Sequence, residues 1–256
     1  MSWRHVTHSH VTDYISYLLD TTDLSPSTIR TRISAVAYFY KSRLNVNPTQ
    51  SFGTDILLKH LDKTSSAKRR LPINKVLLDQ LLLTVYQRES KFLSHAFYLM
   101  YFFLYMFALR ISELLDYSKT FQHALRVQDV SLKNNVLSVR VRSGKHNSSS
   151  MTYTVPCFPR LFWNFTQFLR LRGNRAGPFF CFKNRRPISR SFFANSFKQD
   201  LCSLGVAPAR YNTHSFRIGR TTDLALSGAS DRQIALVGRW RSDAFREYIG
   251  PRMVAL

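Results

Sequence analysis

The stretch that decides the fold spans residues 213–251 and reads THSFRIGRTTDLALSGASDRQIALVGRWRSDAFREYIGP. His214 and Arg217 stand three residues apart, so on a helix their side chains share one face. A Gly-Arg-Trp triplet follows at 238–240, and Tyr248 lies nine residues after the arginine of that triplet. A phenol accompanied by cations and an imidazole is suited to attack a phosphodiester while the cations hold its charge.

Upstream, residues 108–115 read ALRISELL and form a second motif. The segment that leads into it, residues 97–109, predicts a buried helix, because it is strongly apolar yet shorter than the roughly twenty residues of a bilayer span. An arginine beside such a helix is more often a surface residue whose aliphatic stem lies along it. A guanidinium also matches two phosphate oxygens as they gain charge, and the end of a buried helix would fix Arg110 for that task.

Together these motifs resemble those of the tyrosine recombinases, the phage-type integrases, and most closely their eukaryotic mobile-element branch of crypton and DIRS-like recombinases. In that branch the C-terminal stretch reads much like HSFRIG, then LGRW, then a tyrosine. The resemblance covers roughly residues 10–252 and is strong over 108–117 and 211–250. It implies a fold that is mainly α with a small antiparallel β-sheet, composed of a helical N-terminal core-binding (SAM-like) domain and a tyrosine-recombinase catalytic domain.

The resemblance implies a catalytic role for the main motif residues. Tyr248 is the expected nucleophile and would form a covalent 3′-phosphotyrosyl intermediate. Arg110 and Arg217 are expected to clamp the phosphate. His214 is expected to donate a hydrogen bond to the phosphate or to relay the proton of the tyrosine.

Two supporting positions leave a choice open. Glu113 resembles the acidic residue that orients the first arginine, with Asp116 as a second candidate. Nine residues before the tyrosine most of the family carries a His or Trp that donates to the phosphate, whereas here Arg239 holds that place and Trp240 is its neighbour. The Gly-Arg-Trp form is typical of the mobile-element branch, and either Arg239 or Trp240 could face the phosphate.

A catalytic lysine is expected on a β-hairpin. Residues 136–142 and 151–155 alternate apolar and polar side chains, which predicts two antiparallel strands joined by the turn-rich SGKHNSSS. A lysine in such a turn is most often only a solvated residue. The family, however, carries a lysine there that protonates the leaving 5′-hydroxyl, which points to Lys145, with His146 and Lys133 as alternatives.

The N-terminal part predicts a separate helical domain. Residues 9–62 read as a small bundle, in which Ser25-Pro26 begins a helix. The polar, basic segment 63–70 is the expected linker, so the domains are expected at 1–67, for DNA binding, and 68–256, for catalysis. The expected DNA-contacting side chains are basic residues of the linker and the bundle: Lys68, Arg69, Arg70, Arg30 and Arg32.

The composition agrees with a nucleic-acid partner. There are 37 Lys and Arg against 15 Asp and Glu, a net charge of +22, so a nucleic acid is the leading partner, with an ordinary basic surface or a membrane-attracted one as the alternative. The resemblance implies double-stranded DNA as the partner and no membrane. Three cysteines without a Cys-x-x-Cys pair predict neither a disulfide framework nor a zinc site. The N-terminal histidines read as solvated residues, so no metal or other cofactor is expected, and the first residues lack the apolar segment of a signal peptide.

We therefore expect a site-specific DNA recombinase that cuts and rejoins strands without metal or ATP, for integration or excision of a mobile element. By resemblance it would act as a homotetramer on two DNA sites, in the nucleus of a eukaryotic host or in the cytoplasm or nucleoid of a prokaryotic one. The rivals are a catalytically inactive, domesticated DNA-binding protein derived from such an enzyme, a type IB topoisomerase and, more distantly, a membrane-surface protein.

Overall fold

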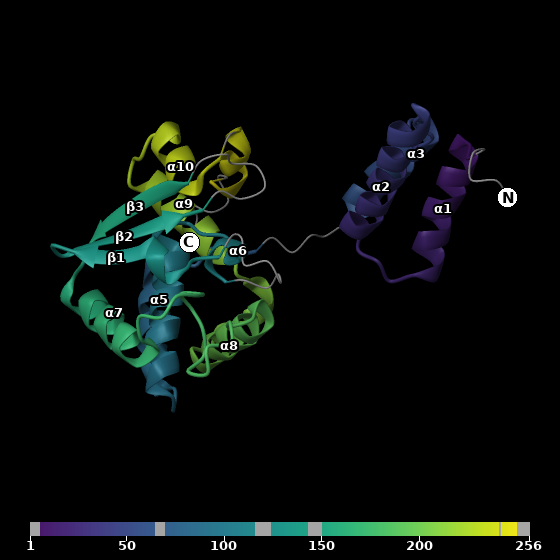
Figure 1. The fold of residues 1–256 in the computed structure, drawn as a ribbon. Helices are drawn as coiled ribbons and strands as arrows, with labels where there is room; N and C mark the ends of the chain where they lie inside the picture. The colour runs from purple at the N-terminus through teal and green to yellow at the C-terminus, as the bar shows by residue number, and fades with distance from the viewer. Residues whose placement is uncertain (1–5, 65–69, 116–123, 143–149, 241, 250–256) are drawn as a thin grey trace. The chain divides into compact units, whose positions relative to one another are not determined.

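The computed structural model describes residues 6–64, 70–115, 124–142, 150–240 and 242–249, and Figure 1 shows their secondary structure. Side chains are described for the same residues apart from 62–64, 247 and 248. The chain divides into two compact units, Met1–Lys68 and Arg69–Leu256, where the sequence places the boundary after residue 67. Each unit has its own hydrophobic core.

Within its described residues, the N-terminal unit consists of α1 (His8–Thr21), α2 (Pro26–Leu44) and α3 (Phe52–Thr64). The predicted start of α2 is confirmed: the Ser25 side chain accepts a hydrogen bond from the Thr28 N–H, and Pro26 occupies the first turn. A small apolar core, to which all three helices contribute, holds the unit together: Val11, Ile15, Leu18, Ile29, Ile33 and Leu61.

A long aromatic helix forms the centre of the C-terminal unit. α4 (Lys75–Thr84) precedes it, and α5 itself (Lys91–Met106) buries nearly all of its side chains. α7 (Pro159–Arg172) packs along α5. α8 (Arg190–Ser203) contributes Phe193, which stacks on Phe97 of α5, and Phe197, which meets the ring of Tyr101 edge to face. The predicted buried helix is therefore confirmed. Among the described residues no helix combines the length and apolarity needed to cross a bilayer.

The sheet has three antiparallel strands in the order β1 (Val130–Lys133), β2 (Val136–Val141) and β3 (Met151–Pro156). β2 and β3 are the two predicted strands, and the apolar side chains of β2 are buried as their alternation predicts. The sequence does not predict β1, because four residues give too short an alternation to recognise. β1 joins β2 through Asn134-Asn135, both with positive φ, as in the two-residue turns typical of hairpins.

Short elements after α5 and around α9 carry the candidate residues. α6 (Ile111–Leu114) follows α5, and α9 (Ser215–Leu226) leads through α10 (Asp231–Gly238) to the 3₁₀ helix η5 (Asp243–Tyr248). Figure 1 shows α9 and α10 next to the sheet, where the Tyr153 hydroxyl of β3 donates to the Leu236 carbonyl of α10 at 3.4 Å. This arrangement brings α6, α9, α10 and β3 together near the C-terminal end of α5, where Phe107 and Ala108 follow the helix.

A glycine in α9 allows close packing at this place. A Cβ atom on Gly219 would lie only 1.8 Å from the carbonyl oxygen of Ile73. The Ile73 N–H donates to the Ser215 carbonyl at 3.0 Å, so the segment before α4 runs directly against the first turn of α9. The Phe-Arg-Ile-Gly sequence therefore ends in glycine because another backbone occupies the space of its side chain.

Candidate active site

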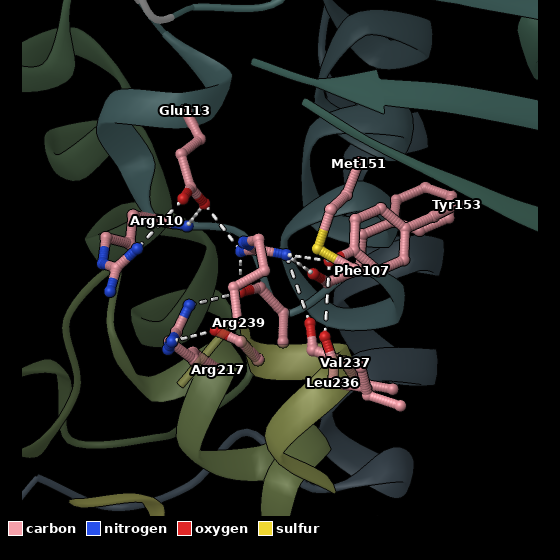
Figure 2. Close-up of polar contacts among 11 residues, drawn as sticks. Phe107, Arg110, Glu113, Met151, Tyr153, Arg217, Leu236, Val237 and Arg239 are labelled. Carbon is pink, nitrogen blue, oxygen red and sulfur yellow. Dashed lines mark hydrogen bonds and ion pairs between the residues drawn. The ribbon is translucent and has the colours of Figure 1, made fainter. Parts of the chain in front are cut away.

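A buried carboxylate organises the site (Figure 2). Glu113 of α6 accepts from Arg110 Nη1 through Oε1 at 3.1 Å, and from the Arg110 backbone N–H through Oε2 at 2.6 Å. The same Oε2 accepts from Arg239 Nη2 at 2.7 Å. The contact between Glu113 and Arg110 is the one that the sequence predicts, whereas Arg239 is a second partner that the sequence does not pair with Glu113. The other acidic candidate, Asp116, lies outside the described residues.

The backbone after α5 places Arg110 at the surface. Ala108 has a φ of +44°, a left-handed conformation that costs a non-glycine residue on the order of 1 kcal/mol. The turn at Ala108 makes Arg110 the N-cap residue of α6. Its side chain is 48% exposed, so Arg110 is available to an anion that arrives from solvent.

Arg217 lies buried beneath this surface, in the first turn of α9. Its Nη1 donates to the Ala108 carbonyl at 2.9 Å, and its Nη2 donates to the Gly238 carbonyl. The guanidinium also lies 4.0 Å from the centroid of the Trp240 ring, within the range of a cation–π contact. Figure 2 shows Arg217 in the same cluster as Arg110 and Arg239, and its hydrogen bond to the Ala108 carbonyl fastens α9 to the loop after α5.

The Gly-Arg-Trp triplet has a steric explanation. A Cβ atom on Gly238 would lie 1.5 Å from Cζ3 of Trp240, so the indole ring rests directly on the glycine backbone. The ring also packs on Phe245, with 6.1 Å between ring centroids. A larger residue at position 238 would displace the indole from Arg217.

Arg239 points into the protein. As the C-cap residue of α10 it has a φ of +59°, and its side chain is only 3% exposed. Its terminal nitrogens donate to five protein acceptors: the carbonyl oxygens of Phe107, Ala108 and Val237, the hydroxyl of Tyr153 and the carboxylate of Glu113. The sequence leaves open whether Arg239 or Trp240 faces the phosphate. Here the terminal nitrogens of Arg239 face protein acceptors, and the ring of Trp240 faces Arg217.

His214 is the N-cap residue of α9 and is half-buried. Its backbone N–H donates to the Asn212 side chain at 2.9 Å, and the Asn212 N–H donates to the Ser215 hydroxyl at 3.1 Å, so a local turn begins the helix. Burial lowers the pKa of His214 below its ordinary value of 6.5, and the positive charges of Arg217 and Arg110 lower it further. A pKa below 6.5 favours the neutral imidazole at pH 7, the form that can accept a proton.

Two predicted catalytic side chains lie outside the described set. Tyr248 ends η5, which packs with α9 and α10, and nothing of its side chain is described. Lys145 and the alternative His146 fall in the gap between β2 and β3. The remaining alternative, Lys133, ends β1 beside the turn to β2, so it lies roughly 17 Å, the length of β2, from the strand end that leads toward Lys145.

The predicted DNA-contacting residues differ in their surroundings. Arg32 is exposed on α2, whereas Arg30 is half-buried and donates to the Leu58 carbonyl of α3 at 2.7 Å. Arg70 donates to the Ala209 carbonyl within the C-terminal unit. Lys68 and Arg69 lie outside the described residues. Arg30 and Arg70 therefore hold their own units together whatever else they contact.

Sequence reasoning missed the acceptors that fix the site. The carbonyl oxygens of Phe107 and Ala108 receive arginine nitrogens, and a backbone acceptor has no signature in a sequence. Tyr153 is a third missed partner, with Arg239 Cζ 5.5 Å from the centroid of its ring, and only its inward position in β3 could have suggested it. As for metal ligands, the described part of the chain contains no group of three or more His, Cys, Asp or Glu that could hold an ion.

No protein-family model and no curated protein matches the sequence. Solved structures do match. The Tn1549 transposon integrase in complex with transposon right-end DNA has a TM-score of 0.65 at 16% identity, over 96% of this chain and 81% of that chain. The XerH site-specific recombinase bound to a palindromic difH substrate has a TM-score of 0.68 at 14% identity, over 96% and 69% of the two chains. A lambda integrase dimer bound to a core site has a TM-score of 0.60 at 13% identity, over 98% of this chain and 66% of that chain.

These similarities show the fold. The mainly helical chain with its small three-stranded antiparallel sheet has the tyrosine-recombinase fold, as the sequence predicts. At identities of 13–16% the relatives carry no residue roles across to this chain. The particular closeness to crypton and DIRS-like recombinases stays a prediction.

Proposed function

We propose that this protein is a site-specific DNA recombinase that cuts and rejoins DNA through a covalent 3′-phosphotyrosyl intermediate. One observation carries the proposal: the segment that holds Arg110 and Glu113 and the first turn of α9, which holds Arg217 and lies more than a hundred residues later, come together beside a half-exposed guanidinium. The fold supports it, since its structural relatives include two integrases and a recombinase solved with DNA. The net charge of +22 supports it as well, because duplex DNA is the polyanion such a surface would bind.

In the proposed reaction the phenol oxygen of Tyr248 attacks phosphorus, and the bond from phosphorus to the 5′-oxygen breaks. The phenol proton passes to His214, whose lowered pKa favours the neutral form at pH 7, and the leaving 5′-oxygen receives a proton from Lys145. One phosphodiester replaces another, so attack by a 5′-hydroxyl on the phosphotyrosine reseals the strand without ATP. Nothing is oxidised or reduced.

Two arginines would supply the positive charge for this reaction. Arg110 is exposed enough to bind the non-bridging oxygens directly. Arg217 adds a second charge from beneath, in a dry environment where its field is little screened. Arginines can play the part that metal ions play in other phosphoryl-transfer enzymes.

The wider setting belongs to the same proposal. The enzyme would act on double-stranded DNA as a homotetramer on two sites, in integration or excision of a mobile element, and in the nucleus if its host is eukaryotic. The alternative is an inactive, domesticated DNA-binding protein derived from such an enzyme. It would share the DNA affinity but lack the covalent step.

The decisive experiment is covalent attachment to a nicked DNA substrate, which traps the intermediate and is read on a denaturing gel. Tyr248→Phe should abolish attachment and keep DNA affinity within about threefold, because only one hydroxyl is lost. Tyr211→Phe is the matched control and should still attach. Attachment by Tyr248→Phe would move the nucleophile elsewhere, and no attachment by the unaltered protein would favour the inactive alternative.

A further inference from the structure

We propose that Arg239 is a positioning residue, which fixes Glu113 and through it the guanidinium of Arg110, and which does not itself bind DNA. The inference rests on the proposed function, since it concerns how the same site holds a phosphate. It also assigns to this position a role other than the phosphate contact that the sequence motif suggests.

The hydrogen bonds of Arg239 leave little for a ligand. Nη2 has two hydrogens and two acceptors, the Ala108 carbonyl at 2.9 Å and Glu113 at 2.7 Å. Nη1 has two hydrogens for three acceptors, at 3.0, 3.2 and 3.3 Å. Only Nε lacks a partner among the described residues, and it is buried. A phosphate oxygen could reach Arg239 only if these contacts were broken.

The contacts of Glu113 show what Arg239 controls. Oε2 is shared by Arg239 Nη2 and the Arg110 backbone N–H, which leaves Oε1 to accept from the Arg110 side chain. Because the carboxylate is held on one oxygen, its other oxygen has a fixed position for Arg110 Nη1. Without Arg239 only the Arg110 backbone N–H would hold Oε2, so the carboxylate and the exposed guanidinium bound to it would be less firmly oriented.

The backbone at Arg239 is shaped for this inward contact. The left-handed conformation at the end of α10 turns the side chain back toward the loop after α5. The helix before η5, and so the segment that ends in Tyr248, is thereby fastened to Glu113. Arg239 thus joins the segment of the proposed nucleophile to the segment of the exposed arginine.

A double-mutant cycle in the full chain tests the inference. Single-turnover attachment at saturating nicked DNA is measured for Arg239→Met, Glu113→Gln and the double variant. Arg239→Met alone should slow attachment on the order of a hundredfold. In the Glu113→Gln background, Arg239→Met should lower the attachment rate by no more than about threefold, because the carboxylate through which Arg239 acts is gone. DNA affinity should stay within about threefold throughout.

Further variants distinguish a positioning role of Arg239 from a general loss of folded structure. Arg239→Lys keeps a cation near Glu113, so its attachment rate should be about tenfold higher than that of Arg239→Met. Arg232→Met, an exposed arginine on the same helix, should attach at the normal rate. Urea unfolding of the DNA-free proteins shows whether each variant folds, and needs no activity. It should show non-additive stabilities for the pair Glu113 and Arg239.

An equal loss of rate from Arg239→Met in both backgrounds would overturn the inference and indicate a direct contact with DNA. Additive stabilities would overturn it as well, because they would mean that the two side chains do not interact. Absence of attachment in the unaltered protein is a different result. It would refute the proposed function, while the unfolding cycle would still decide whether Arg239 and Glu113 are coupled.

Discussion

The C-terminal unit contains two buried carboxylates, Glu113 and Asp129, that are held in the same way. Each is the third residue of a short helix, Asp129 in the 3₁₀ helix η3 (Val127–Asp129), and each accepts from the backbone N–H three residues earlier, at 2.6 Å and 2.9 Å. Each also binds two guanidinium groups, and in both pairs one arginine is about half exposed, at 48% and 47%.

The two clusters differ in where their arginines come from. Arg140 of β2 and Arg142, the residue after β2, reach Asp129 from 11 and 13 residues along the chain, beside a short antiparallel pairing. Arg239 reaches Glu113 from 126 residues away. The Asp129 cluster can therefore form with its own hairpin, whereas the Glu113 cluster is complete only when α10 has docked. The first braces a local structure, and the second joins separate parts of the proposed active site.

The largest expected effect is a difference in attachment rate between variants of the two half-exposed arginines, Arg110 and Arg140. Arg110→Ala should lower the rate of attachment at saturating DNA by roughly 10²–10³-fold, as for removal of a donor that stabilises developing charge. Arg140→Ala should change that rate by less than about threefold, because Arg140 belongs to the bracing cluster. The measurement is the same single-turnover attachment to nicked DNA. An equal loss of attachment rate in the two variants would mean that the Glu113 cluster and the Asp129 cluster contribute equally to the reaction.

How far the sequence predicts these clusters depends on the range of their contacts. The strands that carry Arg140 and Tyr153 were predictable, since alternation is a local signal. The helix before Arg110 and the pairing with Glu113 were also accessible, because both lie within one short motif. β1 escaped because it offers only four residues.

The inward direction of Arg239 could not be read from the sequence. It depends on a left-handed backbone at a position that holds no glycine, and on carbonyl oxygens of Phe107 and Ala108 more than a hundred residues away. Neither leaves a pattern of side chains. The motif marked position 239 as important, but only packing decides whether such an arginine faces a ligand or the interior.

A smaller effect is expected when the less exposed arginine of each pair is removed. Arg239→Met should destabilise the protein by about 3 kcal/mol, because it leaves a buried carboxylate with one guanidinium fewer and removes one donor from each of four other acceptors. Arg142→Met should cost about 1.5 kcal/mol, since its side chain is 23% exposed and Arg140 remains. Urea unfolding at pH 7 measures both. A cost for Arg142→Met as large as for Arg239→Met would contradict the view that the Asp129 cluster is the more local and better solvated of the two.

The smallest expected effect is a dependence on pH at Asp129. Burial alone would raise the pKa of Asp129, but hydrogen bonds from Arg142, the Arg126 N–H and Arg140 outweigh burial and hold it below 3.8. The folded state therefore favours the ionised carboxylate. Its contribution to stability is complete above pH 3.8 and is lost as the pH falls through the lowered pKa.

Asp129→Asn should accordingly be less stable than the unaltered protein at pH 6, and the gap should narrow below pH 3.8 as Asp129 becomes protonated. Urea unfolding from pH 6 to pH 3 follows the gap, with Asp79→Asn, an exposed carboxylate paired with Lys75, as the control for general acid effects. A gap that stays constant over this range would show that the arginines do not hold the carboxylate ionised. Hydrogen-bond geometry alone would then explain the cluster. Asp129 and Glu113 would be alike in their hydrogen-bond geometry but not in the stabilisation of a charged carboxylate.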